Sequence, residues 1–496
     1  MTVRQIAKSL LLNPADNVCV VTAARGRVPE GHKIAFKRIG ANKPVIKFGQ
    51  VIGLAKRTIM PGEHVHMHNM RFSDKIEFSE SAPGKFMPEG RSRLPHTFQG
   101  YLRKDGRAGT RNYVVVISTV NCSARVVRDV SRHFENAKLS KIKVDGVIPI
   151  VHHSGCAQAL GGRSDRLLNR TIAGWFAHPN VAGAVVIGLG CEDINVRSII
   201  SGLEKRNKLS LPLFDSFNIQ DAGGTKKAIA LGVKKVERVL SGLPSFKRVN
   251  LPVSLLTVAL NCGGSDAFSA ITANPALGIA SDTLVSYGGT VVLGETPECF
   301  GAEKLLSKRC VSKKDKERLR DIFLHWRKLA KFHNINMNNN LAPGNITGGI
   351  SSILEKSLGA ISKAGVSPIR QVLDYGQQIT GRGLVFMDTP GFDPVSVTGL
   401  VAGGCNLVAF TTGRGSMYGC SIAPTLKIAT NSELFNKFKN DMDLDAGGSL
   451  VKSSLEQVGR EIYNSFIQVA GGRPTCSEKQ GLGKEEFVPW QLGETL

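Results

Sequence analysis

Four cysteines follow short apolar runs that are typical of buried strands. They are Cys122, Cys156, Cys191 and Cys262, after runs at 113–118, 146–151, 184–189 and 255–260. Because the carboxyl ends of parallel strands share one edge of a sheet, we expect these thiols to converge. Thiolates bind iron, as a single ion or as an iron–sulfur cluster, and Glu192 is a further candidate ligand. The alternative is that cysteine is simply a common small buried residue just past a strand.

The segment 261–266, with the sequence NCGGSD, combines the last of these cysteines with polar groups. Its two glycines let the backbone turn tightly and approach a bound group. Ser265, Asp266 and the later Asn274 supply polar side chains where a core strand has just ended. This pattern is typical of the rim of an α/β sheet, where ligands bind. The alternative is a helix start with Ser265 or Asp266 as its N-cap.

Histidines form a second group of candidates. His152 and His153 precede one of the strand-end cysteines. His64, His66 and His68 alternate along the chain, so an extended strand would place all three on one face. Three imidazoles on one face could bind a divalent metal. The alternative is a polar face turned to solvent or to a neighbouring domain.

Two further stretches favour an anionic ligand. Arg414 lies between glycines after the apolar run 407–410, and its planar guanidinium suits a carboxylate. The polar loop 338–349, which contains Asn345, offers amides to an anion. The alternative for Arg414 is a turn with a solvated side chain.

The elements that must position these residues indicate an α/β fold. Residues 1–72 read as a small all-β module, and 73–97, which are polar and punctuated by proline and glycine, as a linker. From 98 to 245, apolar runs alternate with helical segments, which predicts a parallel sheet. Residues 250–496 read as a second, longer α/β domain.

Composition restricts the partners. The chain has 496 residues and a formal net charge of +24. Its lysines and arginines are dispersed and not interleaved with aromatic residues, so a small anionic substrate is favoured over a nucleic acid. No apolar run reaches the ~20 residues that span a bilayer, and the N-terminus lacks a signal-peptide pattern, so we expect no membrane contact and a reducing cytoplasm. Assembly into a homo-oligomer stays open.

At this point several motifs match one family in chain order. They are residues 62–69 (GEHVHMHN), 109–112 (GTRN), 187–192 (IGLGCE), 262–266 (CGGSD), 272–275 (TANP), 301–303 (GAE), 343–345 (PGN), 355–359 (EKSLG) and 412–415 (TGRG). The chain resembles the altronate dehydratase/galactarate dehydratase family of sugar-acid hydro-lyases, and its histidine motif is more similar to the altronate branch. The resemblance implies a SAF-type β-clip module at the N-terminus. It also implies dehydration of a hexonate or hexarate with a divalent metal, usually iron.

From the chemistry of the residues we assign roles within that reaction. His152 or His153 would be the base, and Asp266 an acid or metal ligand. Arg111 and Arg414 would bind the carboxylate.

The hypothesis is a dehydratase that converts D-altronate to 2-keto-3-deoxy-D-gluconate with Fe²⁺ as its cofactor. Mn²⁺ and an iron–sulfur cluster are the alternative cofactors. Galactarate dehydration, sulfolactate cleavage and a non-catalytic sugar-acid-binding homologue are the alternatives. Ile346 stands where the family usually has a lysine, which removes a carboxylate contact or proton carrier.

Overall fold

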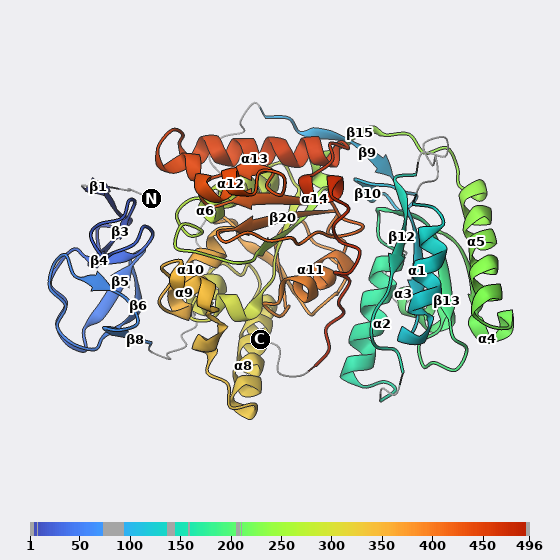
Figure 1. Ribbon diagram of the computed structural model, residues 1–496, viewed down its shortest axis with the longest axis horizontal. Helices are drawn as coiled ribbons and strands as arrows, with labels where there is room; N and C mark the ends of the chain where they lie inside the picture. Colours follow the sequence, from blue (N-terminus) through green and yellow to red (C-terminus); the bar gives the residue numbers. More distant parts are fainter. Residues whose placement is uncertain are drawn as a thin grey trace.

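The computed structural model describes residues 4–6, 8–72, 94–135, 144–156, 159–204, 209 and 211–492. The N-terminal module and the second domain lie on opposite sides of the large C-terminal domain (Figure 1). This arrangement confirms the predicted α/β class with a small β module at the N-terminus. Most of the predicted linker, residues 73–93, lies outside the described residues. Among the described helices, none has both the length and the apolar content needed to cross a membrane.

The N-terminal module consists of short antiparallel strands in two sheets. The first has the order β1 (Arg4–Ile6), β2 (Ser9–Leu11), β3 (Val18–Val21), β4 (Lys33–Ala35), β7 (His64–Val65). The second has the order β5 (Pro44–Lys47), β6 (Gln50–Ala55), β8 (Met70–Arg71). Strand β7 is only two residues long, so the extended strand predicted through His68 is wrong. A turn replaces it, in which the side chain of Asn69 accepts a hydrogen bond from the amide of His66.

The second domain has a four-stranded parallel sheet, as the alternating pattern predicts. Its order is β12 (Gly146–Ile150), β11 (Tyr113–Ser118), β13 (Val181–Gly188), β14 (Leu213–Asn218). The associated helices are η1 (Asn121–Ser123), α1 (Ala124–Arg132), α2 (Arg163–Phe176), α3 (Val196–Glu204), α4 (Ile219–Ala222) and α5 (Thr225–Gly242). A small sheet of β10 (Ala108–Gly109), β9 (Thr97–Leu102) and β15 (Val249–Pro252) joins this domain to the next.

The C-terminal domain is built on seven parallel strands. Their order is β18 (Ile369–Leu373), β19 (Gly383–Met387), β17 (Thr290–Leu293), β16 (Thr257–Cys262), β20 (Leu407–Thr412), β21 (Thr425–Ala429), β22 (Leu444–Asp445). The α-helices are α6 (Ala273–Ser286), α7 (Glu303–Ser307), α8 (Lys313–Phe332), α9 (Pro343–Thr347), α10 (Ile353–Ser362), α11 (Asp393–Ala402), α12 (Ser432–Lys437), α13 (Leu455–Ala470) and α14 (Cys476–Lys479). Short 3₁₀ helices are η3 (Val253–Leu255), η4 (Thr296–Cys299), η5 (Met337–Asn340) and η6 (Gly447–Leu450).

Both faces of this sheet are covered, which is why its strands read as continuous apolar runs. Helices α6 and α13 pack together over one face. Helix α11 covers the other face and packs against α2 of the second domain. The buried residues of these layers form two large apolar clusters, one on each side of the sheet. The second cluster continues into the second domain, so the two domains share a core.

The N-terminal module docks on the C-terminal domain through buried charges. The ammonium of Lys33 lies 2.9 Å from one carboxylate oxygen of Glu355, and that of Lys47 lies 2.7 Å from the other. These three side chains are at most 2% exposed. Burial alone would raise the pKa of Glu355, but the two lysines hold it well below its usual value. Two cations on one carboxylate therefore fix the module against α10.

Candidate functional site

A cavity opens at the point where the order of the large sheet changes direction. The chain passes from β16 to β17 on one side of β16, whereas β20 lies on the other side. Ligands of open α/β sheets bind at the carboxyl ends of the strands flanking such a point. Here the cavity measures about 680 Å³ and is lined by Asp266 after β16 and by Gly413 and Arg414 after β20. The N-terminal module completes its wall with Leu10, Thr22 and Glu30.

Asp266 is held rigidly at the wall of this cavity. Its Oδ1 accepts hydrogen bonds from the amide and hydroxyl of Ser269 and from the hydroxyl of Thr430. Its Oδ2 accepts longer hydrogen bonds, 3.1 Å from the hydroxyl of Thr430 and 3.3 Å from the side-chain amide of Asn431. A Cβ at Gly413 would lie 2.2 Å from the carboxyl carbon of Asp266, so this approach requires glycine. Burial raises the pKa of Asp266, while these donors favour its ionised form.

Charges of both signs line the rest of the cavity. Arg414 and Lys437 supply cations, and Glu30 and Glu433 supply carboxylates. Partial burial raises the pKa of Glu30, and the charges of Glu433 and Asp266 raise it further. The three carboxyl groups therefore influence one another across the cavity. A ligand with a negative end and several hydroxyl groups would match this lining.

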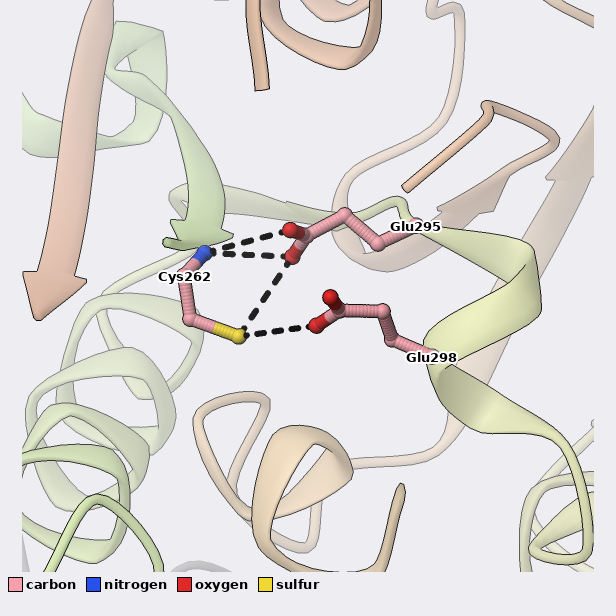
Figure 2. Close-up of side chains that lie close together, drawn as sticks. All are labelled: Cys262, Glu295 and Glu298. Carbon is pink, nitrogen blue, oxygen red and sulfur yellow. Dashed lines mark hydrogen bonds between the residues drawn. The ribbon is translucent and has the colours of Figure 1, made fainter. Parts of the chain in front are cut away.

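A second group of acids lies enclosed at the end of β16. The thiol of Cys262, the carboxylate of Glu295 and that of Glu298 have ligand atoms within 4.8 Å of one another (Figure 2). Glu295 follows β17, and Glu298 lies on η4. The backbone amide of Cys262 donates to Glu295, and its thiol lies 3.3 Å from Glu298. Among the described residues this is the one group of three or more histidine, cysteine or acidic side chains that meets this spacing.

Two lysines, one on α10 and one directly after it, oppose the negative charge of these acids. Lys356 pairs with Glu298 at 2.6 Å, and Lys363 contacts both Glu295 and the sulfur of Cys262. Burial opposes the charge of Lys363, but the facing thiol and carboxylates together raise its pKa. Burial also raises the pKa of Glu295 to about 8. The group is thus a dense buried network of acids and bases.

Several predicted substrate-binding residues have structural partners instead. The guanidinium of Arg111 donates to both carboxylate oxygens of Glu478 and to backbone carbonyls, and the side chain is buried. Asn274 donates to the carbonyl of Gly359 and accepts from Thr411. These two side chains hold the fold together, because their polar atoms are already satisfied inside the protein.

Asn345, Ser265 and Ile346 lie close to the cavity without facing it as predicted. The side-chain amide nitrogen of Asn345 donates to the carbonyl of Ser265. Its side-chain oxygen accepts from the backbone amide of Ala342, the residue before α9. Ser265 is buried beside a small internal cavity that it shares with Asp266. Thr347 and Gly348, rather than Ile346, line the 680 Å³ cavity. The anion-binding loop predicted at 338–349 is therefore partly helical, and its Asn345 caps α9.

The predicted bases lie in the second domain, away from Asp266. His152 is buried, and its ring nitrogens contact the carbonyl of Ser118 and the amide of Ser154. Burial lowers its pKa to about 4. His153 is exposed and lines a separate cavity of about 450 Å³. Neither histidine lines the 680 Å³ cavity beside Asp266.

The strand-end cysteines divide between the two parallel sheets. Cys122, Cys156 and Cys191 are exposed in the second domain, whereas Cys262 is buried in the C-terminal domain. The expectation that all four converge is wrong, because the strands that precede them belong to different sheets. Glu192 accepts hydrogen bonds from Thr119 and from the amides of its own loop, so its carboxylate is already engaged.

Three histidines of the N-terminal module do gather, although only His64 lies on a strand. The rings of His32, His64 and His66 lie 5.1 to 5.5 Å apart, centre to centre. His32 contacts His64 at 3.0 Å and the carbonyl of Thr347 at 3.2 Å. The Nε2 atom of His66 is buried with no hydrogen-bond partner among the described residues. Their nitrogens do not meet the 4.8 Å spacing found at Cys262, so metal binding by His64 and His66 stays a prediction.

Comparisons with known proteins match all three parts of the chain. Family models match residues 21–73 (Altronate/galactarate dehydratase SAF domain), 100–243 (D-galactarate dehydratase/Altronate hydrolase, second domain) and 253–495 (D-galactarate/Altronate dehydratase, C-terminal). An altronate dehydratase from Bacillus subtilis is 34% identical over 95% of this chain and 92% of its own length. The chain belongs to the altronate/galactarate dehydratase family. This confirms the predicted family and its SAF module.

Two further proteins have a comparable similarity to this chain. The Escherichia coli galactarate dehydratase (L-threo-forming) is 36% identical over 93% of this chain and 90% of its own length. The beta subunit of a (2R)-sulfolactate sulfo-lyase from Chromohalobacter salexigens is 33% identical over 80% of this chain and 98% of its own length. Identity alone does not separate these substrates.

Sequence reasoning missed several residues of the two sites. Glu30 and Glu433 are far apart in sequence and follow no strand that signals a site. Lys356 and Lys363 read as ordinary helix lysines, although Lys356 lies in one of the family motifs. Glu295 and Glu298 are the exception, because the sequence alone indicates them: clustered carboxylates that follow an apolar run such as 290–293 can bind metal or act as general acid and base.

Proposed function

We propose that this protein dehydrates D-altronate to 2-keto-3-deoxy-D-gluconate in the cavity beside Asp266. One observation carries the proposal: the cavity lies at the switch point of the large sheet and combines Arg414 with carboxylates. Family membership makes sugar-acid dehydration the reaction class that the cavity has to serve.

The balance of charges favours an acid with one anionic end. Arg414 and Lys437 would bind the carboxylate of the substrate, with the arginine fork binding both oxygens. Glu433 would accept hydrogen bonds from its hydroxyl groups, whereas Glu30 in its protonated form would donate one. The second carboxylate of galactarate, or the sulfonate of sulfolactate, would meet Glu433 and be repelled. The lining therefore supports altronate over both alternatives.

The carboxylates can also move the protons that the reaction requires. The dehydration takes the proton from the carbon next to the carboxylate and expels the hydroxyl of the neighbouring carbon. Asp266 would accept the proton through Oδ2, because its other oxygen is the more heavily hydrogen-bonded one. Glu30, whose pKa is raised, would protonate the leaving hydroxyl. The acceptor and the donor then come from different domains.

The residues at the end of β16 fit a divalent ion by charge. Four acidic groups face two lysines, so once metal binding displaces their protons the acids carry two uncompensated negative charges that a divalent ion would neutralise. These acids are Cys262, Glu295, Glu298 and Asp393, and the lysines are Lys356 and Lys363. Burial and Glu298 raise the pKa of Asp393 to about 7. The nearby Oδ1 atom of Asn261 is also buried without a hydrogen-bond partner among the described residues.

For that reason we propose that Cys262, Glu295 and Glu298 would hold Fe²⁺ or Mn²⁺. When bound, the ion would supply positive charge that stabilises the anion formed after proton removal. The segment 263–266 connects this group to Asp266, which places both at the end of one strand.

The proposal is tested by turnover of altronate, galactarate and sulfolactate under anaerobic conditions. Keto acid and sulfite are measured with and without added Fe²⁺. We expect keto acid from altronate, more than tenfold faster than from galactarate, and no sulfite. Sulfite release, or faster turnover of galactarate, would contradict the argument from Glu433. Binding of altronate without product would identify a non-catalytic homologue.

The variant Asp266→Asn tests the assigned base. Because a general base contributes about 10²- to 10⁴-fold, we expect a loss of that size in kcat with altronate still bound. Asp282→Asn is the control, since Asp282 is a half-buried aspartate that accepts hydrogen bonds from Ser367 and from the backbone amide of Val366 away from the cavity. Equal kcat in Asp266→Asn and wild type would remove Asp266 from the mechanism.

A further inference from the structure

The second domain carries three exposed thiols at one edge of its sheet. Of the ten cysteines, Cys122, Cys156 and Cys191 are exposed, Cys476 is half-buried and the other six are buried. The three follow β11, β12 and β13, which are neighbours in the order β12, β11, β13. Free thiols are usually kept out of solvent because they oxidise. Three in neighbouring loops therefore indicate a shared purpose.

Contacts between residues next to these cysteines join the three loops. The amide of Asn121, next to Cys122, donates to the carbonyl of Ser154 at 3.0 Å. On the other side, the hydroxyl of Thr119 donates to Glu192 at 2.6 Å, and Glu192 directly follows Cys191. The loop after β11 thus touches both of its neighbours. The loop after β12 approaches closely, because a Cβ at Gly155 would lie 2.4 Å from the carbonyl of Thr119.

The carboxylate of Glu192 joins two of these loops by hydrogen bonds and is therefore not a candidate ligand. It accepts from Thr119 and from the amides of Leu189 and Gly190. These bonds hold the loop that carries Cys191 in one shape and join it to the loop after β11. Glu192 is therefore a positioning residue for the thiols.

The spacing of the three sulfurs does not suit a single metal ion. A metal–sulfur bond of about 2.3 Å places two sulfur ligands of one ion at most about 4.6 Å apart. Within the described part of the chain, these three thiols do not form a group whose ligand atoms all lie within 4.8 Å. An iron–sulfur cluster binds each thiolate at a different iron, so it spans a wider set of sulfurs.

Cavities lie next to the loops that carry two of the thiols. One of about 770 Å³ opens beside Gly190 and Glu192, the neighbours of Cys191, and a second of about 450 Å³ is lined by Cys156 and His153. The edge lies at the switch point of the four-stranded sheet, because the chain continues from β11 to β12 on one side and β13 lies on the other. A bound group would therefore occupy the usual ligand position of this domain.

We propose that Cys122, Cys156 and Cys191 hold a [4Fe–4S] cluster at the carboxyl edge of the second domain. Three protein thiolates leave one iron without a cysteine ligand. Cys262 is not the fourth ligand, because it lies in the other parallel sheet and contacts Glu295, Glu298 and Lys363. The proposal stands apart from the choice of sugar acid.

The test begins with wild-type protein purified without oxygen and reconstituted with ferrous iron and sulfide. We expect about four acid-labile sulfides and about five irons per chain, four in the cluster and one at the ion site proposed at Cys262, with visible absorption that dithionite bleaches. The triple variant Cys122→Ser, Cys156→Ser, Cys191→Ser should bind no sulfide. Cys476→Ser, which removes a half-buried thiol elsewhere, is the matched control and should retain the full content. A cluster in the triple variant, or metal without sulfide in the wild type, would overturn the proposal.

A second measurement uses the wild-type protein alone, so it does not depend on the variants folding. Alkylation followed by peptide mass spectrometry should label the three exposed cysteines before reconstitution and fail to label them afterwards. Cys476 should be labelled to the same extent in both samples. Unchanged labelling of Cys122, Cys156 and Cys191 after reconstitution would show that these thiols do not hold the cluster.

Discussion

At the scale of single residues, Arg111 and Arg414 show how the same side chain can have opposite roles. Arg111 is 4% exposed, and Glu478 and backbone carbonyls occupy its donors. Arg414 is exposed in the loop after β20 and lines the cavity. A guanidinium already paired inside the protein stabilises the fold, whereas one that faces a cavity is available to a ligand.

We therefore predict different effects for the two lysine substitutions. Arg414→Lys should raise the KM for altronate about tenfold, because lysine lacks the planar guanidinium fork. The free energy of unfolding should change little. Arg111→Lys should leave KM unchanged and lower the free energy of unfolding by about 1–3 kcal/mol. Steady-state kinetics and urea denaturation separate the two effects. A raised KM in Arg111→Lys alone would reverse the assignment.

Buried neutral histidines predict sensitivity to acid. Burial lowers the pKa of His152 to about 4 and that of His178 to about 3. The unfolded chain binds these protons near pH 6.5, so unfolding binds protons and becomes easier as the pH falls below 6.5. Each group should remove at most about 1.4 kcal/mol per pH unit, down to its folded pKa. Urea denaturation between pH 7 and 5 measures this loss.

The variant His178→Gln should flatten that dependence, since glutamine does not titrate. His133→Gln is the control, because His133 is exposed in the loop after α1 and should leave the slope unchanged. A slope that is the same in His178→Gln and wild type would show that His178 does not carry the effect.

At the scale of elements, α10 connects the N-terminal module to the buried acid network. Glu355 binds Lys33 and Lys47 of the module, and the next residue, Lys356, binds Glu298. Lys363, directly after the helix, binds Glu295. One helix therefore presents charges to two neighbours, so the docking of the module and the geometry of the network are mechanically linked.

We predict that Glu355→Gln destabilises the protein strongly. It leaves two buried lysines without their anion, and breaking a buried pair costs about 3–5 kcal/mol. Glu63→Gln is the matched control in the same module, because the pair of Glu63 with Arg57 is largely exposed and should contribute less than about 1 kcal/mol. Urea denaturation measures both variants. Equal stability of the two would mean that Glu355 does not hold the module in place.

At the scale of the whole molecule, the net charge of +24 attracts an anionic substrate. The cavity itself carries both signs, so the attraction acts at long range rather than in the bound complex. Long-range attraction of this kind raises the rate of association and is screened by salt.

We accordingly predict that kcat/KM for altronate falls several-fold as ionic strength rises from about 0.01 M to about 0.15 M. The value of kcat should change little, since it refers to the bound complex. A neutral osmolyte at the same osmolality is the control and should leave kcat/KM unchanged. A kcat/KM independent of salt would show that the net charge does not steer the substrate.

The sequence by itself determined the local elements and the family. Apolar runs such as 255–260 and 290–293 predicted β16 and β17, because strands buried on both faces need continuous apolar side chains. Asp266 was identified as a site residue, because glycines and polar groups after a core strand are a local signal.

Only the tertiary structure decided which polar groups share a site. It separated Cys262 from the other three cysteines, since β16 pairs with β17 and β20 in its own sheet. It paired Arg111 with Glu478, 367 residues away, and brought Glu30 to the cavity of Asp266. Such pairings depend on the order of strands and the docking of domains. Neither produces a local sequence pattern around the residues that come into contact.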